Sequence, residues 1–424
     1  MAQKRISAKK ASKKTESQVA TPKTKGPATP IQRFAHPFFT TKPVTERKAV
    51  PGVGVRMTDH IEQTLLAIPD PIRNPPTMSL DEIVGQEGAA SIAASGSIVF
   101  HAVGDTGHAG GSTENMQEFV ADAMTKDFDI AHPDVSPAFF LHLGDVNYYD
   151  NTDAGYHEQF YVPYKLYPGK ILAIPGNHDG ELFKFDGKST GQTETLQAFQ
   201  RNFVQPAPSV PAAAGSIYRQ MVSQPGVYWL LNAPFVDIIG LYSNVAENPG
   251  FLSGKFIGTK QTDWLGRTLS GIATARKSGT RKALFLAVHH PPFSGGSHSS
   301  STDMLGEIDG ICQTAGIMPD VVLAAHSHDY QAYTRFITFQ DREMQIPFLV
   351  AGGGGRGLSP HVAKATGVRT GDHSLDKSLR DYGYLTVKVT NSIAILTFNQ
   401  VGEGGKITQF DQVKVDLATS RVSR

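Results

Sequence analysis

From Ser97 onward, the sequence repeats one pattern: a short apolar run, a polar turn that contains glycine, and a segment with helical spacing. Short buried strands that alternate with helices are typical of α/β proteins. The runs predicted to form strands are 98–103, 138–143, 171–174, 227–231, 236–241, 283–288, 321–325 and 348–351. The segments predicted to form helices include 113–126, 193–202, 260–269 and 302–314. An α/β fold is therefore the first expectation.

The two ends of the chain depart from this pattern. Near the C-terminus, the runs 384–389 and 393–398 are joined through Thr390-Asn391, which predicts an antiparallel hairpin. Residues 1–48 hold 12 of the 40 Lys and Arg but only 2 of the 39 Asp and Glu, and they lack apolar periodicity. Such a segment buries too little apolar surface to offset the entropy of ordering, so we expect a disordered basic tail. The net charge of +1 thus averages a basic tail with an acidic body.

The composition divides the chain into three parts. We expect the tail at 1–48, an extension packed on the body at 49–95, and one large domain at 96–417. The alternative role for the tail is weak contact with a polyanion such as nucleic acid. No run of about 18 or more apolar residues occurs, and no apolar segment follows the first lysines, so we expect neither a membrane span nor a secretory signal. A cytoplasmic location is the default expectation, with export left open.

Five of the predicted strands end in polar motifs. In chain order they are Gly104-Asp105-Thr106-Gly107, Gly144-Asp145-Val146-Asn147-Tyr148, Gly176-Asn177-His178-Asp179, His289-His290-Pro291-Pro292 and His326-Ser327-His328. Ligands converge at the carboxyl ends of strands in an open α/β sheet, so we expect these side chains in the same half of a sheet. Singly, each motif has an ordinary explanation as a turn. Together they supply two carboxylates, an amide and three or more imidazoles, the donors that a binuclear metal site requires.

A site of this kind suits the hydrolysis of phosphate esters. Two cations roughly 3.5–4 Å apart neutralise the anionic oxygens and hold both the nucleophile and the leaving oxygen. Zinc lowers the pKa of a bound water from about 15.7 to about 7, so hydroxide becomes available near neutral pH. Cys312 is the only cysteine, which excludes an intrachain disulfide and a zinc site built from thiolates. Any metal must therefore use oxygen and nitrogen ligands.

The ordered motifs resemble the five-block signature of the calcineurin-like metallophosphoesterases, and the tyrosine of the second block resembles the purple acid phosphatase branch. The resemblance covers about 97–330. It implies an αββα sandwich, with two mixed β-sheets flanked by helices, and a catalytic domain over 96–417. It also implies the ligands: Asp105, Asp145, Tyr148 and His328 for one metal, and Asp145, Asn177, His289 and His326 for the other, with Asp145 as the bridge.

The same resemblance implies the reaction. Phosphomonoesters would be hydrolysed by a metal-bound hydroxide, with Asp145 and Asn177 in the catalytic centre and His178 contacting the phosphate or protonating the leaving group. The alternative for His178 is a hydrogen bond to a ligand, without contact to the substrate. One rival function is a phosphodiesterase acting on cyclic nucleotides, nucleic acid or lipid headgroups, and another is a non-catalytic binding scaffold. The expected partner is a small phosphate ester, and the sequence predicts no oligomeric state.

Gly107 departs from the family pattern. Many members have His at this position, so the first metal must find another ligand. Tyr148 fills the vacancy, and a phenolate ligand favours ferric iron, which predicts Fe paired with Zn, Mn or Fe. Two alternatives stay open: His108 supplies the missing imidazole, or Tyr148 or Tyr149 packs beneath the site.

Two smaller points concern the last motifs. Ala325 stands where the family usually has Gly, which is a mild change. His289 takes the family's position directly after the apolar run, so it is the preferred ligand, with His290 as the alternative. A further run, Gly352-Gly353-Gly354-Gly355-Arg356, follows the strand predicted at 348–351. It lacks the Lys-Ser/Thr of a P-loop, so a tight loop under the site is the expectation.

Overall fold

The computed structural model describes residues 65–107, 116–184, 187–279 and 281–424. The predicted basic tail at 1–48 and His108 therefore lie outside the described residues. Within the described ranges, no helix combines the length and the apolar character needed to cross a membrane.

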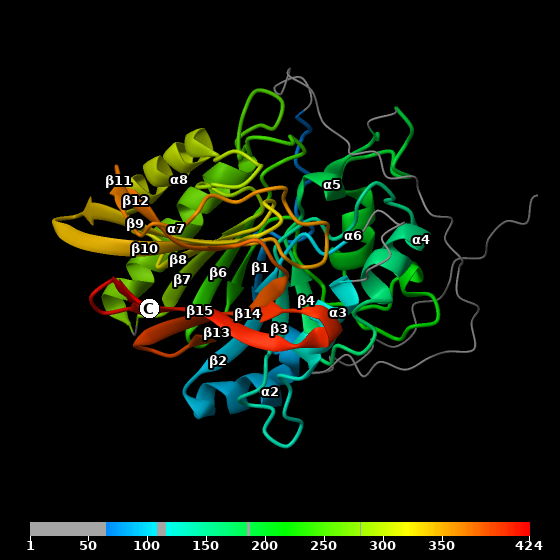
Figure 1. The fold of residues 1–424 in the computed structure, drawn as a ribbon, viewed down its shortest axis with the longest axis horizontal. Helices are drawn as coiled ribbons and strands as arrows, with labels where there is room; N and C mark the ends of the chain where they lie inside the picture. Colours follow the sequence, from blue (N-terminus) through cyan, green and yellow to red (C-terminus); the bar gives the residue numbers. More distant parts are fainter. Residues whose placement is uncertain (1–64, 108–115, 185–186, 280) are drawn as a thin grey trace, which may run out of the picture. The chain divides into compact units, whose positions relative to one another are not determined.

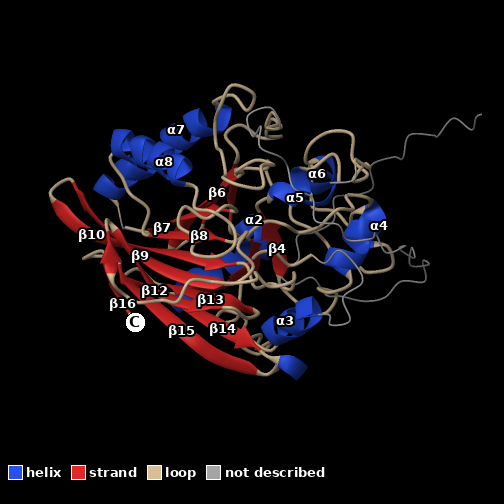
Figure 2. Ribbon diagram, turned by 45° about the horizontal axis from the view of Figure 1, so that its top comes forward, coloured by secondary structure: helices blue, strands red, loops and turns tan. Residues whose placement is uncertain are grey.

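Two mixed β-sheets form the centre of the described fold (Figures 1 and 2). In spatial order, the first sheet contains β1 (Thr77–Ser79), β5 (Trp229–Asn232), β6 (Val236–Leu241), β7 (Ala283–Val288), β8 (Val321–Ala324), β10 (Arg342–Ala351), β9 (Tyr330–Phe339), β12 (His373–Leu379) and β11 (Arg369–Thr370). The second sheet contains β16 (Arg421–Ser423), β15 (Ile407–Asp416), β14 (Ile393–Val401), β13 (Gly383–Val389), β2 (Ile98–Val103), β3 (Phe139–His142) and β4 (Lys170–Ala173).

Helices flank both sheets. They are α2 (Asp81–Ser95), α3 (Met116–Thr125), α4 (Asp153–Tyr156), α5 (Asn177–Gly180), α6 (Gln197–Phe203), α7 (Lys260–Ser278) and α8 (Thr302–Ala315). Figures 1 and 2 show α7 and α8 together on the side of β7 and β8, whereas α3 lies near β13 and β14. The predicted α/β sandwich of two mixed sheets flanked by helices is confirmed.

The sequence of β7 shows why the strands next to the site are buried on both faces. Its residues alternate between two apolar cores, because successive side chains of a strand point to opposite faces. Phe285 points into the core between the sheets, which also contains Phe100 and Ile238. Leu284 and Leu286 point into the core that includes residues of α7 and α8. A strand covered on both faces reads as a continuous apolar run, which β7 shows in full and β2 and β6 show apart from His101 and Asp237.

Most predicted elements are present, with different ends. The hairpin of β13 and β14 is antiparallel as predicted. The predicted helix 193–202 begins later, at Gln197 in α6, while α7 continues past residue 269 to Ser278. β9, β12 and β15 are strands that the sequence analysis did not predict. In β9, buried polar residues such as Gln331 and Thr334 interrupt the apolar alternation, which hides the strand.

The prediction that all five polar motifs follow strands of one sheet was wrong. β2, β3 and β4 belong to the second sheet, whereas β7 and β8 belong to the first. Their side chains still meet, because the carboxyl ends of both groups of strands lie at the same edge of the sandwich. Asp145, which follows β3, lies 3.4 Å from His289, which follows β7. The candidate site is therefore a junction between two sheets.

Candidate metal centre

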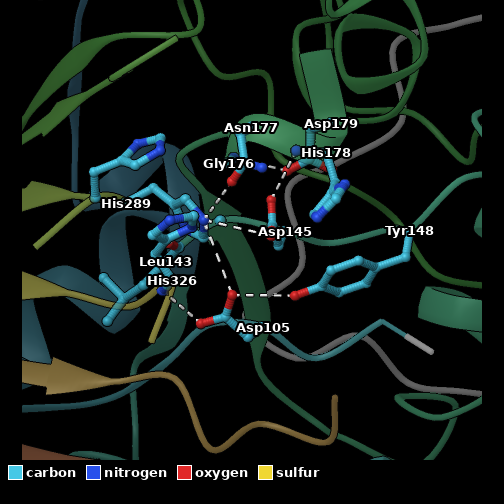
Figure 3. A network of polar contacts seen from close by, with 12 residues as sticks. Asp105, Leu143, Asp145, Tyr148, Gly176, Asn177, His178, Asp179, His289 and His326 are labelled. Carbon is cyan, nitrogen blue, oxygen red and sulfur yellow. Dashed lines mark hydrogen bonds and ion pairs between the residues drawn. The ribbon is translucent and has the colours of Figure 1, made fainter. Parts of the chain in front are cut away.

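Three motif residues have an unusual backbone conformation. Asp105, Asp145 and His326 have φ angles of 54°, 53° and 66°. Positive φ is uncommon for residues other than glycine, and such strain concentrates at functional sites, where the surrounding structure holds it. Each residue follows a strand, and the left-handed turn aims its side chain at the junction of the sheets (Figure 3).

One half of the site is formed by Asp105, Tyr148 and His328. The Tyr148 hydroxyl lies 3.1 Å from Asp105 Oδ1 and 3.2 Å from His328 Nε2. His328 Nε2 lies 3.6 Å from the same carboxylate oxygen. Tyr149, by contrast, accepts a hydrogen bond from Arg356 at 3.3 Å. The structure thus turns Tyr148, and not Tyr149, toward the carboxylate.

The other half is formed around His289. Its Nε2 lies 3.2 Å from Asn177 Oδ1 and 3.4 Å from Asp145 Oδ2 (Figure 3). Asp145, His289 and His326 each offer one ligand atom within 4.8 Å of the others, and all three residues are buried. The backbone N–H of His326 donates to Asp105 Oδ2 at 2.6 Å, which links the two halves.

Backbone carbonyls anchor the three imidazoles. His289 Nδ1 bonds the Leu143 carbonyl at 2.8 Å, and His328 Nδ1 bonds that of Gly357 at 2.8 Å. His326 uses Nε2, which bonds the carbonyl of Glu247 at 2.7 Å. A carbonyl only accepts, so each anchored nitrogen carries the proton, and a neutral ring presents a lone pair on its other nitrogen. Metal-ligating histidines are oriented in this way.

His290 is arranged differently. Its Nε2 bonds the Ala246 carbonyl at 2.8 Å and its Nδ1 bonds Ser243 Oγ at 2.7 Å, so both ring nitrogens are engaged. Burial and the neighbouring His289 lower the pKa of His290 to about 3, which keeps this ring neutral. Of the two adjacent histidines, His289 is the one with a nitrogen directed at the carboxylates.

This contrast gives a first prediction. His289→Ala should weaken metal binding more than about 100-fold, which exceeds the roughly 10–100-fold typical of losing an outer partner of a ligand. His290→Ala is the matched control, because it removes an adjacent buried imidazole whose nitrogens are both engaged elsewhere. Metal content by elemental analysis, with competition against a chelator, measures both. Equal loss of metal from the two variants would show that the choice of His289 is wrong.

Asp179 supports the centre from behind. Its carboxylate accepts hydrogen bonds from the backbone N–H groups of Gly176 at 2.8 Å and Val146 at 3.2 Å. These bonds tie the loop after β4 to the loop after β3. Gly176 is required here, because a Cβ at this position would lie 2.1 Å from Asp145 Oδ1. The sequence analysis missed this role of Asp179, although the residue stands in one of the five motifs.

The pKa shifts of the buried groups show that a positive charge would stabilise the ionised acids of the site. Burial and the nearby Asp145 carboxylate together raise the pKa of Asp105 to about 8, against the opposing effect of His289. Burial lowers the pKa of His289, but the Asp145 carboxylate outweighs it and raises the pKa to about 9. Burial and Asp105 also raise the pKa of the Tyr148 phenol well above its usual range. Burial is the main cause of the pKa shifts of Asp105 and Tyr148, whereas a neighbouring carboxylate causes that of His289.

The donor atoms fit a metal for a related reason. With Nδ1 of His289 bound to a carbonyl, Nε2 is the ring nitrogen that faces Asn177 Oδ1 and the Asp145 carboxylate, and it can release its proton to bind a cation. Asp145 Oδ2 is buried and has no hydrogen-bond partner among the described residues. Without a metal, the proton on His289 balances the charge of the Asp145 carboxylate, and a cation at the same place would replace that proton. The residues present therefore fit a metal ion.

His178 lies beside this centre. Its ring is 4.5 Å from the Tyr148 ring between centroids (Figure 3), and its Nδ1 bonds Glu181 Oε2 at 2.9 Å. The backbone N–H of His178, and not its ring, bonds Asp145 Oδ1 at 3.0 Å. Burial lowers the pKa of His178, but Glu181 and Asp145 outweigh this effect and hold the pKa well above its usual value. Glu181 was missed in the sequence, where it follows the third motif without a distinctive pattern.

Comparison with known proteins gives a family. Residues 98–330 match the model of the calcineurin-like phosphoesterases. Among solved structures, the chain is similar to the purple acid phosphatase PPD1 from yellow lupin (Lupinus luteus) seeds, with a TM-score of 0.52 and 14% identity over 76% of this chain and 54% of that chain. The chain thus spans about half the length of that phosphatase. At this identity, the similarity shows the fold alone.

Two further solved structures have lower TM-scores. GAP50, the anchor in the inner membrane complex of Plasmodium, has a TM-score of 0.47 and 12% identity, over 76% of this chain and 89% of that chain. PhoD has a TM-score of 0.47 and 13% identity, over 77% of this chain and 71% of that chain. A comparison with curated proteins finds no match in sequence. From the match of residues 98–330 and the fold, the chain belongs to the calcineurin-like phosphoesterase family.

Proposed function

We propose that this chain hydrolyses phosphomonoesters at a centre of two metal ions. The observation that carries the proposal is the convergence of potential ligand atoms from His289, Asn177 and Asp145 beside the Asp105, Tyr148 and His328 group. Asp145 lies between the two groups in Figure 3, which suits a carboxylate shared by both metals. The complete donor set also argues against a non-catalytic scaffold, in which at least one donor would be expected to be lost.

The donors divide into two sets. One metal would be held by Asp105, Asp145, Tyr148 and His328, and the other by Asp145, Asn177, His289 and His326. The first set contains a phenol, which as a phenolate favours ferric iron. The second set contains imidazoles, an amide and a carboxylate, which suit Zn, Mn or Fe. When bound, the two cations acidify a water and neutralise the charge of the phosphate oxygens.

The residues of the chain have distinct tasks in this proposal. The pKa of His178 lies well above its usual value, which favours the protonated form, and its buried side chain is still 8% accessible, so it can donate a proton to the leaving oxygen. Glu181 is fully buried and holds His178 Nδ1, which fixes the ring and leaves Nε2 as the nitrogen available to a substrate. Asp145 Oδ1 accepts the backbone N–H of His178, so the proton donor and the metal ligand keep a constant separation.

The test compares two esters. The purified chain is assayed with p-nitrophenyl phosphate and bis(p-nitrophenyl) phosphate, and its metal content and visible spectrum are recorded on the same sample. We expect a higher kcat/KM for the monoester, bound iron, and a visible absorption band from the Tyr148 phenolate on iron. Preference for the diester with manganese or zinc and no such band would favour a phosphodiesterase instead and assign Tyr148 to packing. The absence of turnover with any of these metals would contradict catalysis itself.

A further inference from the structure

The glycine run after β10 forms a tight loop against the candidate metal ligands. A Cβ on Gly352 would lie 2.5 Å from Asp105 Oδ2, so only glycine allows this approach. The backbone N–H of Arg356 donates to the Asp105 carbonyl at 2.9 Å. The Gly357 carbonyl accepts from His328 Nδ1 at 2.8 Å, and Ser359 N–H donates to the His328 carbonyl at 3.0 Å. The loop is therefore fixed to both Asp105 and His328.

This loop places the Arg356 guanidinium beside the two tyrosines. Its central carbon lies 4.6 Å from the centroid of the Tyr148 ring and 5.5 Å from that of Tyr149. One of its nitrogens donates to the Tyr149 hydroxyl at 3.3 Å. The Tyr148 hydroxyl in turn lies 3.1 Å from Asp105 Oδ1. The guanidinium is therefore packed on a ring whose hydroxyl belongs to the donor set.

Arg356 has no carboxylate partner among the described residues, although carboxylates lie close to the site. Arg335 in the same domain, by contrast, pairs with both Asp309 and Asp372. An arginine that stacks the face of its guanidinium on aromatic rings leaves most of its five N–H donors available for other hydrogen bonds. A positive charge held on a fixed loop without a counter-ion is suited to an anion that arrives from outside.

The partly exposed residues mark the side from which the anion arrives. The side chains of Asp105 and His289 are fully buried, whereas those of His178 and His328 are 8% and 16% accessible. Arg356 is also partly exposed. Of the two partly exposed residues, His328 and Arg356, only Arg356 carries a permanent positive charge.

We propose that Arg356 binds a phosphate oxygen of the substrate and makes the site selective for monoester dianions over diesters. This inference rests on the proposed function. A phosphomonoester has three non-bridging oxygens, so one remains for Arg356 when the others face the metals. A diester has two, and its second ester group would occupy the place of the third. The guanidinium fork recognises a phosphate with two parallel N–H groups, which a lysine cannot reproduce.

The experiment measures ester selectivity in the full-length chain loaded with metal. For Arg356→Ala we expect kcat/KM for p-nitrophenyl phosphate to fall about 10- to 100-fold, the range for losing a charge-assisted hydrogen bond. The kcat/KM for bis(p-nitrophenyl) phosphate should change little. For Arg356→Lys, the kcat/KM for p-nitrophenyl phosphate should lie between the values for Arg356→Ala and for the parent. Binding of inorganic phosphate, measured by calorimetry, should weaken by a similar factor while metal content stays the same.

Arg369→Ala is the matched control, because it removes an exposed arginine that also stacks on an aromatic ring, Phe336, away from the site. It should leave selectivity and phosphate binding unchanged. If Arg356→Ala keeps the monoester-to-diester ratio and the phosphate affinity, or loses metal and both activities together, the inference is overturned. If the parent chain hydrolyses neither ester, the proposed function fails, and phosphate binding to the parent and the variant still decides the role of Arg356.

Discussion

Asp145→Asn is expected to lower turnover of p-nitrophenyl phosphate by about 1000-fold or more, because the metals supply several kcal/mol of charge stabilisation to the reaction. The Asp145 carboxylate lies 3.4 Å from His289 Nε2, and its Oδ2 is buried without a hydrogen-bond partner among the described residues. An amide of the same size keeps one oxygen but removes the negative charge that two cations would share. Turnover and metal content, measured on the same sample, test this expectation.

The control for this substitution is a second buried carboxylate. Asp237 is 5% exposed, lies near the amino-terminal end of β6 in the first sheet, and pairs with Lys282. Asp237→Asn should reduce stability but retain metal and turnover, because Asp237 contributes nothing to the donor set. If Asp145→Asn protein retained both metal ions and parental turnover, neither the shared carboxylate nor the two-metal reaction could stand.

Phe100→Ala is expected to reduce the free energy of unfolding by about 3–5 kcal/mol. Phe100 lies on β2, is fully buried, and stacks on Phe139 of β3 at 5.0 Å between ring centroids. Its ring also meets the edge of Phe285 of β7 at 6.1 Å, so it spans the space between the two sheets. Removing it leaves a cavity in a close-packed interior, and the lost contacts are not replaced. Denaturant titration of the variant and the parent measures the difference.

Phe119→Ala is the matched control for Phe100→Ala. Phe119 lies on α3 and is 36% exposed, so its removal should change the free energy of unfolding by about 0.5 kcal/mol or less. Similar losses for the two variants would mean that packing between the sheets does not dominate the stability of this fold.

The buried parallel strands could be predicted from the sequence with little error. β2, β6 and β7 are covered on both faces, so their apolar runs begin and end where the strands do. α2 was missed because it consists mainly of small residues, and Gly85, with φ of 77°, interrupts it. Arg335 in β9 is satisfied by Asp309 and Asp372, which come from other parts of the chain. Polar residues that find distant partners give no local strand signal.

The residues of the candidate site also fall into those that the local sequence predicts and those that it does not. Each motif directly follows a strand, so the residue types of a metal centre could be read from local sequence. The choice between His289 and His290 could not, because it depends on which ring meets the Leu143 carbonyl and which meets the Ala246 carbonyl. These partners are distant in sequence. Glu181 and Arg356 were not assigned for the same reason: their significance comes from the side chains beside them in space.

The pairing of β2 with β13 has a consequence for biosynthesis. Asp105 follows β2, and β2 is held in its sheet by β3 on one side and by β13 on the other, where Leu385 pairs with Ala102. During translation, one edge of β2 therefore stays unpaired until a strand roughly 280 residues later in the chain has been synthesised. Strand pairing at such separation is slow, and an open apolar edge is prone to aggregation until it is paired. We therefore expect the nascent chain to depend on chaperones until β13 leaves the ribosome, and metal to be captured only after that point.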